Sequence, residues 1–291
     1  MARPLAFVAA LAGLAALLAS CSLARPLHGL TCEPGAANAS CLYGQACDAD
    51  ADCATASCLA GTCQCPTDMV TIDSRFCIDP IEVTNAAYRS FVATNPDPSS
   101  QDAVCQWNAD FSIDDTASGP DVCQTRHKED DYPVTCVNWC DARAFCKSLG
   151  KHLCGKMHGG PNPDSAYADP ARSEWFDACS KSGKLVFPTG AYDPKACNVD
   201  SQGPVPAGAP GQEICEGGYL GLQHMSGNVR EWEDSCSGET GAGDACLTRG
   251  GSFDSGGATT DGHAPDLQCD VHDAYTRDDT DFAIGFRCCS G

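Results

Sequence analysis

Cysteine is the residue with the most chemistry to offer in this sequence, because it occurs 23 times in 291 residues. Cysteines pair as disulfides, bind soft metals, or act as nucleophilic thiolates. Zinc sites are typically built on C-x-x-C pairs, and no such pair occurs in the sequence. The close spacings that do occur, at Cys63/Cys65, Cys136/Cys140 and Cys288/Cys289, differ from those of zinc ribbons. We therefore expect structural disulfides.

Other residue patterns that could perform chemistry are incomplete. Asp48, Asp50 and Asp52 have the spacing of the first three EF-hand ligands, but Cys53 stands where the loop needs glycine and Leu59 where it needs glutamate. We interpret these acids as solvated. No G-x-S-x-G nucleophile elbow is present. The seven histidines are scattered through the chain: His28, His127, His152, His158, His224, His263 and His272.

Charge and cysteine content exclude several classes of protein. Lys and Arg number 18 against 39 Asp and Glu, which gives a net charge of −21. Such a charge repels phosphate backbones, so we expect no nucleic-acid binding. Because glutathione-buffered cytosol does not hold many disulfides, we expect an oxidising compartment and not the cytoplasm.

The amino terminus predicts a secreted, lipid-anchored protein. Arg3 precedes an apolar run over residues 5–18, which is too short to span a bilayer and is typical of a signal peptide. Leu18-Ala19-Ser20-Cys21 resembles a bacterial lipobox. We predict a signal peptide over residues 1–20, acylation of Cys21, and a lipidated linker over 21–31. Ser22, in place of Asp, favours the outer membrane of a Gram-negative bacterium. Ordinary secretion is the alternative.

Residues 32–65 predict a small Cys-rich module of EGF-like type. Seven cysteines fall in this segment, which has few large apolar residues and must depend on crosslinks to fold. Once Cys21 is set aside, both this segment and the rest of the chain hold an odd number of cysteines. If none is free, one disulfide joins the two regions, and Cys77 is the nearest candidate partner.

From residue 66 onward the pattern changes to apolar alternation and amphipathic helices. Val70 with Ile72, and Phe76 with Ile78, predict short strands. Two helices follow. Thr84 can cap the first helix, which carries Ala87, Tyr88, Phe91 and Val92. The second helix runs from about 138 to 149 and ends at Gly150. One of its faces carries Trp139, Ala142, Cys146 and Leu149. Residues 95–133, 156–172 and 200–217 read as irregular loops.

An ordered series of motifs over about residues 66–291 resembles the formylglycine-generating enzyme (sulfatase-modifying factor) family. The resemblance implies a loop-rich α+β fold, stapled here by disulfides and similar to C-type lectins. In chain order the motifs are Ile78-Asp79-Pro80-Ile81-Glu82-Val83-Thr84-Asn85, Leu149-Gly150-Lys151, Ser173-Glu174-Trp175, Phe187-Pro188-Thr189-Gly190, Gly227-Asn228-Val229-Arg230-Glu231-Trp232, Arg249-Gly250-Gly251-Ser252-Phe253 and Ile284-Gly285-Phe286-Arg287-Cys288. We expect Gly250-Gly251 to form a tight turn and Arg287 to be a buried structural donor.

The resemblance implies a copper(I) site that this chain does not match. In the catalytic family two cysteines follow the R-G-G-S motif, and a soft thiolate pair suits copper(I). The first aligns with Ser255 and the second lies near Cys269, for which the parity of the cysteines favours a disulfide. The tryptophan of the family's oxygen pocket falls at Arg230, while Ser252 matches the pocket serine. Copper is therefore not expected, and Cys269 and Ser252 remain only weak catalytic candidates.

The resemblance also implies calcium ions that pin loops. One site would use Gly227, Val229 and Glu231, and a second would use Asn198 and Val199. His224 stands where the first site usually has Asn or Asp, and the acids of the second cannot be placed. Structural calcium is one interpretation, and a cap or salt bridge made by Glu231 within its loop is the other.

Two functional hypotheses follow. In the first, a lipoprotein with a sulfatase-modifying-factor domain has lost the copper-binding pair and acts as a binding or structural module for a peptide, glycan or protein. In the second, the domain keeps an oxygen-dependent oxidase activity on a protein cysteine, with Cys269 as a free thiol. The related sulfoxide synthases use three histidines to bind iron, partly from an added helical domain, and we expect no such site here.

Overall fold

The computed structural model describes residues 45–47, 53, 57–59, 61–113, 129–193, 195–208, 215–256 and 265–291. All of them belong to one compact unit, Cys32–Gly291. The predicted signal peptide, Cys21 and the linker over 21–31 lie outside the described residues. Within the described ranges, no helix combines the length and the apolar character that crossing a membrane requires.

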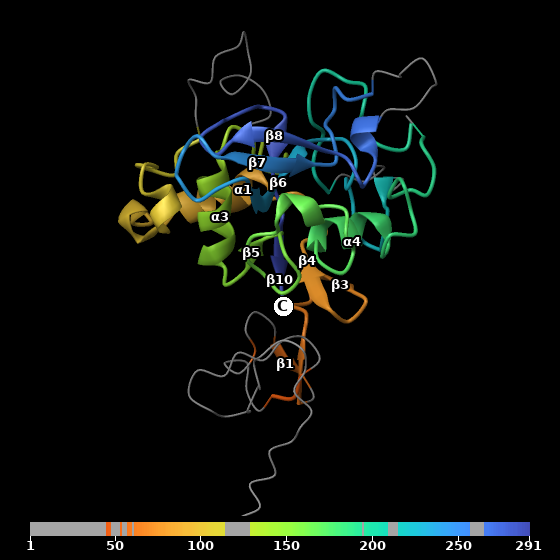
Figure 1. The fold of residues 1–291 in the computed structure, drawn as a ribbon, viewed down its shortest axis with the longest axis horizontal. Helices are drawn as coiled ribbons and strands as arrows, with labels where there is room; N and C mark the ends of the chain where they lie inside the picture. Colours follow the sequence, from red (N-terminus) through yellow and green to blue (C-terminus); the bar gives the residue numbers. More distant parts are fainter. Residues whose placement is uncertain are drawn as a thin grey trace, which may run out of the picture. The chain divides into compact units, whose positions relative to one another are not determined.

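Two four-stranded sheets form the frame of the larger region (Figure 1). The first has the order β3-β4-β10-β5, so the C-terminal strand lies inside it. The second has the order β8-β7-β6-β9, with β6 and β9 parallel and the other pairs antiparallel. The strands are β3 (Val70–Ile72), β4 (Phe76–Ile78), β5 (His152–Leu153), β6 (Arg230–Cys236), β7 (Ala245–Arg249), β8 (His272–Thr276), β9 (Ile284–Gly285) and β10 (Cys288–Ser290).

The two predicted helices are confirmed as α1 (Asn85–Ala93) and α3 (Trp139–Ser148). The Thr84 side chain caps α1 by accepting a hydrogen bond from the Ala87 backbone N–H. Asn138 caps α3 in a reciprocal capping box with Asp141. One expectation is wrong: Leu149 was placed on the apolar face, but it is 55% exposed, because it is the C-cap residue and lies beyond the last helical turn.

The core has two main parts, one beside α1 and α3 and one beside α4 (Glu174–Ser180). In the first, the Phe145 ring lies 5.8 Å from Tyr88 and 5.5 Å from Phe286, measured between ring centroids. In the second, Trp175 and Phe176 pack against the strand residues Ile72, Phe76 and Ile78. The predicted strands over 70–72 and 76–78 are confirmed, and they provide one wall of this second core.

The described parts of the predicted irregular loops contain short 3-10 turns and isolated β-bridges at Pro133, Lys156 and Glu216. These turns are η2 (Pro98–Ser100), η3 (Ala103–Cys105) and η4 (Asp164–Ala166), and a fourth, η6 (Pro265–Leu267), lies near the C-terminus. Side-chain amides support the loops where strands do not; for example, Gln101 Nε2 donates to the Asn108 backbone carbonyl at 2.8 Å. Helix α4 and strands β6 and β7, rather than these loops, carry Trp175, Glu231 and Arg249.

Disulfides attach the C-terminal strand and link the two regions of the chain. Every cysteine that the structure describes is disulfide-bonded. Cys288 and Cys289 of β10 pair with Cys146 and Cys154, closing separations of 142 and 135 residues. The bond between Cys65 and Cys77 is the inter-region disulfide that cysteine parity predicted. Crosslinks that close such long loops are expected to stabilise the fold substantially.

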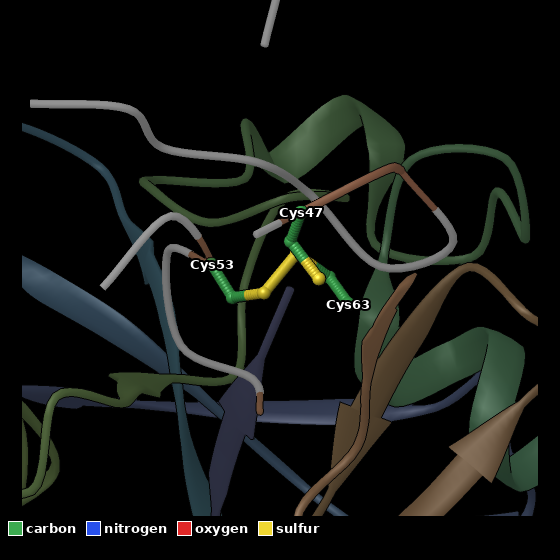
Figure 2. Close-up of side chains that lie close together, drawn as sticks. All are labelled: Cys47, Cys53 and Cys63. Carbon is green, nitrogen blue, oxygen red and sulfur yellow. A yellow bond between two sulfur atoms is a disulfide. The ribbon is translucent and has the colours of Figure 1, made fainter. Parts of the chain in front are cut away.

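The described part of the Cys-rich region is a hairpin, β1 (Ser57–Leu59) and β2 (Thr62–Gln64), with two disulfides. Cys47 pairs with Cys58 and Cys53 pairs with Cys63. The sulfur atoms of Cys47, Cys53 and Cys63 lie within 4.8 Å of one another (Figure 2). Because each of these sulfurs is already bonded to another sulfur, the group cannot serve as a thiolate metal site.

Candidate functional site

A buried ion pair lies where several of the sequence motifs meet. The Arg287 guanidinium donates from Nε to both Glu231 carboxylate oxygens, at 2.9 and 2.8 Å, and from Nη2 to Oε1 at 2.6 Å. It also donates to the backbone carbonyls of Asp79 and Gln223. Trp175 Nε1 donates to Glu231 Oε2 at 2.8 Å. Arg287 is therefore the buried structural donor that the sequence predicted. Glu231 does form a salt bridge, but its partner is Arg287, 56 residues away, and not a residue of its own loop as the second interpretation had it.

Two further titratable side chains are buried beside this pair. Burial raises the pKa of Glu82 to about 8, although Arg287 and a 3.0 Å hydrogen bond from Asn228 act in the opposite direction. Burial, helped by Arg287, lowers the pKa of His224 to about 4. Neither ring nitrogen of His224 has a hydrogen-bond partner among the described residues. At neutral pH both side chains are uncharged, so the buried charge consists of Arg287 and Glu231.

The five residues expected to bind calcium fit that ion poorly. Calcium needs free oxygen ligands, carboxylates above all. Both Glu231 oxygens accept from Arg287, whose positive charge would repel a second cation. The Asn198 and Val199 carbonyls accept hydrogen bonds from the Asn228 and Gly256 backbone N–H groups. Gly227 and Val229 contribute only backbone oxygens to such a site. Calcium at these residues stays a prediction that their contacts do not favour.

A second buried ion pair fixes the glycine turn after β7. Arg249 Nη1 donates to Glu233 Oε2 at 3.1 Å, and Nη2 donates to the Cys269 carbonyl at 2.6 Å. The Arg249 guanidinium lies 4.8 Å from the Trp175 ring centroid, within the range of a cation–π interaction. Gly250 has φ +84°, and a Cβ there would lie 2.9 Å from the Met225 carbonyl oxygen. The expected tight turn is confirmed, since only glycine fits it.

Immediately after this turn lies a polar group that we call the Arg230 cluster: Arg230, Ser252, Asp254, Ser255 and Asp273. Arg230 donates from Nη2 to Ser255 Oγ at 3.2 Å and from Nε to Asp273 Oδ2 at 3.0 Å. Its Nη1 donates to the Ser252 hydroxyl, which in turn donates to Asp254. The Ser252 backbone N–H donates to Ser255 Oγ at 3.0 Å.

The Arg230 cluster brings together three residues that the sequence singled out, Arg230, Ser252 and Ser255. A serine nucleophile needs an adjacent base to take its proton. Among the described residues, neither hydroxyl has a hydrogen bond to a histidine, and both accept from the Arg230 guanidinium. The hydrogen bonds from Arg230 hold both serine hydroxyls in place, which favours a structural role for them. Asp254 and Asp273 were not predicted. Asp254 could have been indicated by its position two residues after Ser252, whereas Asp273, in β8, had no such signal.

Cys269 is part of a disulfide with Cys179 of α4. The residue is 1% exposed, and its carbonyl accepts from Arg249. A disulfide sulfur is neither a thiolate ligand nor a nucleophile of the kind the oxidase hypothesis requires. The structure therefore places Cys269 in the framework around the Arg249 pair, as the parity of the cysteines favoured.

The same substitution at two neighbouring acids tests this charge assignment. Glu231→Gln removes the partner of a buried guanidinium, and we expect a loss of about 3–5 kcal/mol of unfolding free energy. Glu82→Gln replaces a protonated carboxyl with a neutral amide, and we expect a change of only about 1 kcal/mol near neutral pH. Chemical denaturation of the three proteins measures both. Equal losses would contradict the assignment.

The pH dependence gives a second readout on the same variants. Because the pKa of Glu82 is raised from 4.5 to about 8 on folding, its contribution to stability is complete below 4.5 and is lost as the pH rises through 8. Glu82→Gln should therefore gain stability relative to the parent as pH rises across this window, by up to about 1.4 kcal/mol per pH unit. A constant difference would show that Glu82 is ionised in the fold.

Comparison with known proteins identifies the family. The model of the sulfatase-modifying factor enzyme 1-like domain matches residues 42–290. Among solved structures, the chain is similar to CarF (19% identity, TM-score 0.45, 74% of this chain and 85% of that chain). It is also similar to PvdO from Pseudomonas aeruginosa (15% identity, TM-score 0.47, 74% and 80%). No curated protein matches. The chain therefore belongs to the formylglycine-generating enzyme (sulfatase-modifying factor) family, as its motifs indicated.

Proposed function

We propose that this protein is a binding or structural module in which the sulfatase-modifying-factor domain no longer oxidises cysteine. The observation that carries the proposal is the state of the two positions that would hold copper(I). Ser255 offers a hydroxyl that accepts from Arg230, and the sulfur of Cys269 is bonded to Cys179. Copper(I) selects soft thiolates, and neither position offers one.

The remaining cysteines support the same conclusion. All cysteines in the described ranges are disulfide-bonded, so none of them can replace the missing ligand without reduction of a bond. Arg230, which stands at the family's tryptophan, adds a positive charge that disfavours a copper cation nearby. The Arg230 cluster thus stabilises the loop with hydrogen bonds where the catalytic family holds a metal.

A binding role follows from what the domain still presents. Asp254 and Asp273 are the acids of the Arg230 cluster, and their side chains are 52% and 45% exposed. The whole chain carries a charge of −21, which attracts cationic partners over long range. We infer a peptide, glycan or protein ligand, with a protein or peptide of basic character favoured by this charge.

Incubation of the purified full chain with copper, oxygen and a sulfatase peptide containing C-x-P-x-R tests the loss of oxidase activity. We expect no formylglycine by mass spectrometry, because the thiolate pair is missing. A genuine formylglycine-generating enzyme under the same conditions serves as the positive control. Formylglycine produced by this chain would overturn the proposal, as would peptide mapping in which Cys269 carries a free thiol.

We further propose that a lipid on Cys21 anchors the protein in the bacterial cell envelope, on the side of an oxidising compartment. The Leu18-Ala19-Ser20-Cys21 sequence supports this, and so do the disulfides, which require oxidising conditions. Several acyl chains on one residue give stable attachment, since each buried methylene contributes about 0.8 kcal/mol.

A substitution at the acceptor cysteine tests the anchor. Cys21→Ser should abolish metabolic labelling with radioactive palmitate and leave the protein out of the outer-membrane fraction. Cys77→Ser is a control for cysteine loss as such, since it breaks a disulfide and leaves the lipobox intact. If the parent protein takes up no label, or if the serine variant at position 21 stays in the membrane, the anchor proposal is wrong.

A further inference from the structure

A cavity of about 380 Å³ lies away from the Arg230 cluster, between η3, α3 and the end of β6. Trp139 and Arg143 of α3 line one side, and Ala103 and Val104 of η3 line another. Its remaining lining residues are Asp102, Pro161, Asp234, Cys236, Ser237, Gly238, Glu239 and Arg277. None of them is used by the proposed function.

Asp234 is the unusual member of this lining. The residue is 5% exposed, yet its carboxylate has no hydrogen-bond partner among the described residues, and only its backbone groups are bonded, to Cys154 and Asn162. Burying an unpaired carboxylate is costly, so such groups normally bind a donor or a cation. The Asp234 oxygens are not among the fully buried side-chain atoms, so the carboxylate opens into the cavity as an acceptor for a ligand that donates hydrogen bonds.

An irregularity in β6 explains why this carboxylate lines the cavity. Trp232 pairs with Thr248 and Cys236 pairs with Cys246, so four steps along β6 match two along β7. Residues 231–235 are all buried, and the register of β6 shifts between Trp232 and Cys236, the stretch that holds Glu233 and Asp234. Glu233 binds Arg249, whereas Asp234 borders the cavity. Bulges commonly re-aim side chains next to binding sites.

The other buried or half-buried charges of the cavity are already compensated. Asp102 pairs with Arg143 at 2.6 Å and with Lys147 at 3.3 Å. Arg277 pairs at 2.6 Å with Asp244, which lies outside the cavity lining. Glu239 is exposed. The charge of Arg143 also acts on Asp234, but Arg143 forms its ion pair with Asp102, so the Asp234 carboxylate keeps its acceptor oxygens for a cationic donor.

We propose that this cavity binds an alkylammonium group, supplied by a lysine side chain of a partner polypeptide. A lysine ammonium offers three donors and a full charge to Asp234. The apolar surfaces of Ala103, Val104 and Pro161 suit its methylene chain. The excess of acid over the whole chain steers such a cation toward the protein. The inference is independent of the missing copper ligands.

Protonation of Asp234 makes the interaction depend on pH. Burial raises the pKa of Asp234 to about 6, against Arg143 and His152, which favour the charged form. Glu233 and Glu174 raise it further. The lysine ammonium keeps its charge throughout this range, so binding should strengthen as the pH rises above 6 and weaken below it. The other charged groups that line the cavity are Asp102, Glu239 and Arg277.

Three capped amino acids on the full chain test the proposal by ligand-detected NMR titration. They are N-acetyl-lysine methylamide, its uncharged analogue N-acetyl-norleucine methylamide, and the oppositely charged N-acetyl-glutamate methylamide. At about pH 7.5 we expect the lysine compound to bind at least ~10-fold more tightly than either of the others. Equal binding of the norleucine compound, or preference for the glutamate compound, would overturn the proposal.

Matched variants assign the binding to Asp234. Asp234→Asn should weaken lysine binding at least ~10-fold and abolish its pH dependence, whereas Glu239→Gln, an exposed acid of the same cavity, should change it less than ~2-fold. Removal of an unpaired buried charge should not lower the melting temperature, so a loss of binding cannot be attributed to unfolding. Unchanged lysine binding by Asp234→Asn would contradict the assignment, and so would equal losses in both variants.

Discussion

The buried ion pair between Arg287 and Glu231 is the interaction on which the rest of the structure depends. Arg287 comes from the end of the chain and Glu231 from β6, and the same guanidinium binds the carbonyl of Asp79 near the start of the domain. Trp175 of α4 donates a further hydrogen bond to the Glu231 carboxylate. A buried pair costs solvation and is favourable only when every remaining donor and acceptor is satisfied, which makes the arrangement exacting. Motifs far apart in sequence are thereby held in one geometry.

Arg249 and Glu233 form a second buried ion pair, and both pairs contact Trp175. Together they explain why a chain with modest regular structure keeps a defined site. The loops do not need long strands when buried guanidinium groups bind their carbonyls and disulfides close their ends. The family fold is thus retained around a group of serines, Ser252 and Ser255, which is held by Arg230.

The helices and the disulfide between the two regions could be predicted from the sequence, because the apolar pattern with its caps and the number of cysteines indicate them. The Thr84 cap and the pattern from about Asn138 predicted their helices. The odd number of cysteines over residues 32–65 predicted a disulfide to the rest of the chain with Cys77 as the nearest candidate, and the structure has it from Cys65 to Cys77. Helix α4 and strand β6 gave no such pattern, because their buried faces include Glu174, Asp177, Glu231 and Glu233. In a sequence, an acidic residue predicts an exposed position, because Asp and Glu are rarely buried unless an opposite charge or a donor pairs with them.

The same reason limited prediction of the site. Ser255 and Arg230 could be identified by register against the family motifs, and the structure brings them together. Asp234 could not be identified, since an acid is typical of the surface and its place in the lining of the cavity is seen only in the folded chain. The cysteines that the structure describes serve as crosslinks, and the acids Glu231 and Glu233 hold buried guanidinium groups.

Copper(I) affinity tests this account most directly. In an anaerobic competition titration, the full chain without added reductant is mixed with a coloured copper(I) chelator complex. The account predicts that the chelator keeps its metal, because Cys269 is bonded to Cys179 and Ser255 is an alcohol. Transfer of one equivalent of copper(I) to the protein would contradict it, since only a pair of free thiolates binds that ion so strongly.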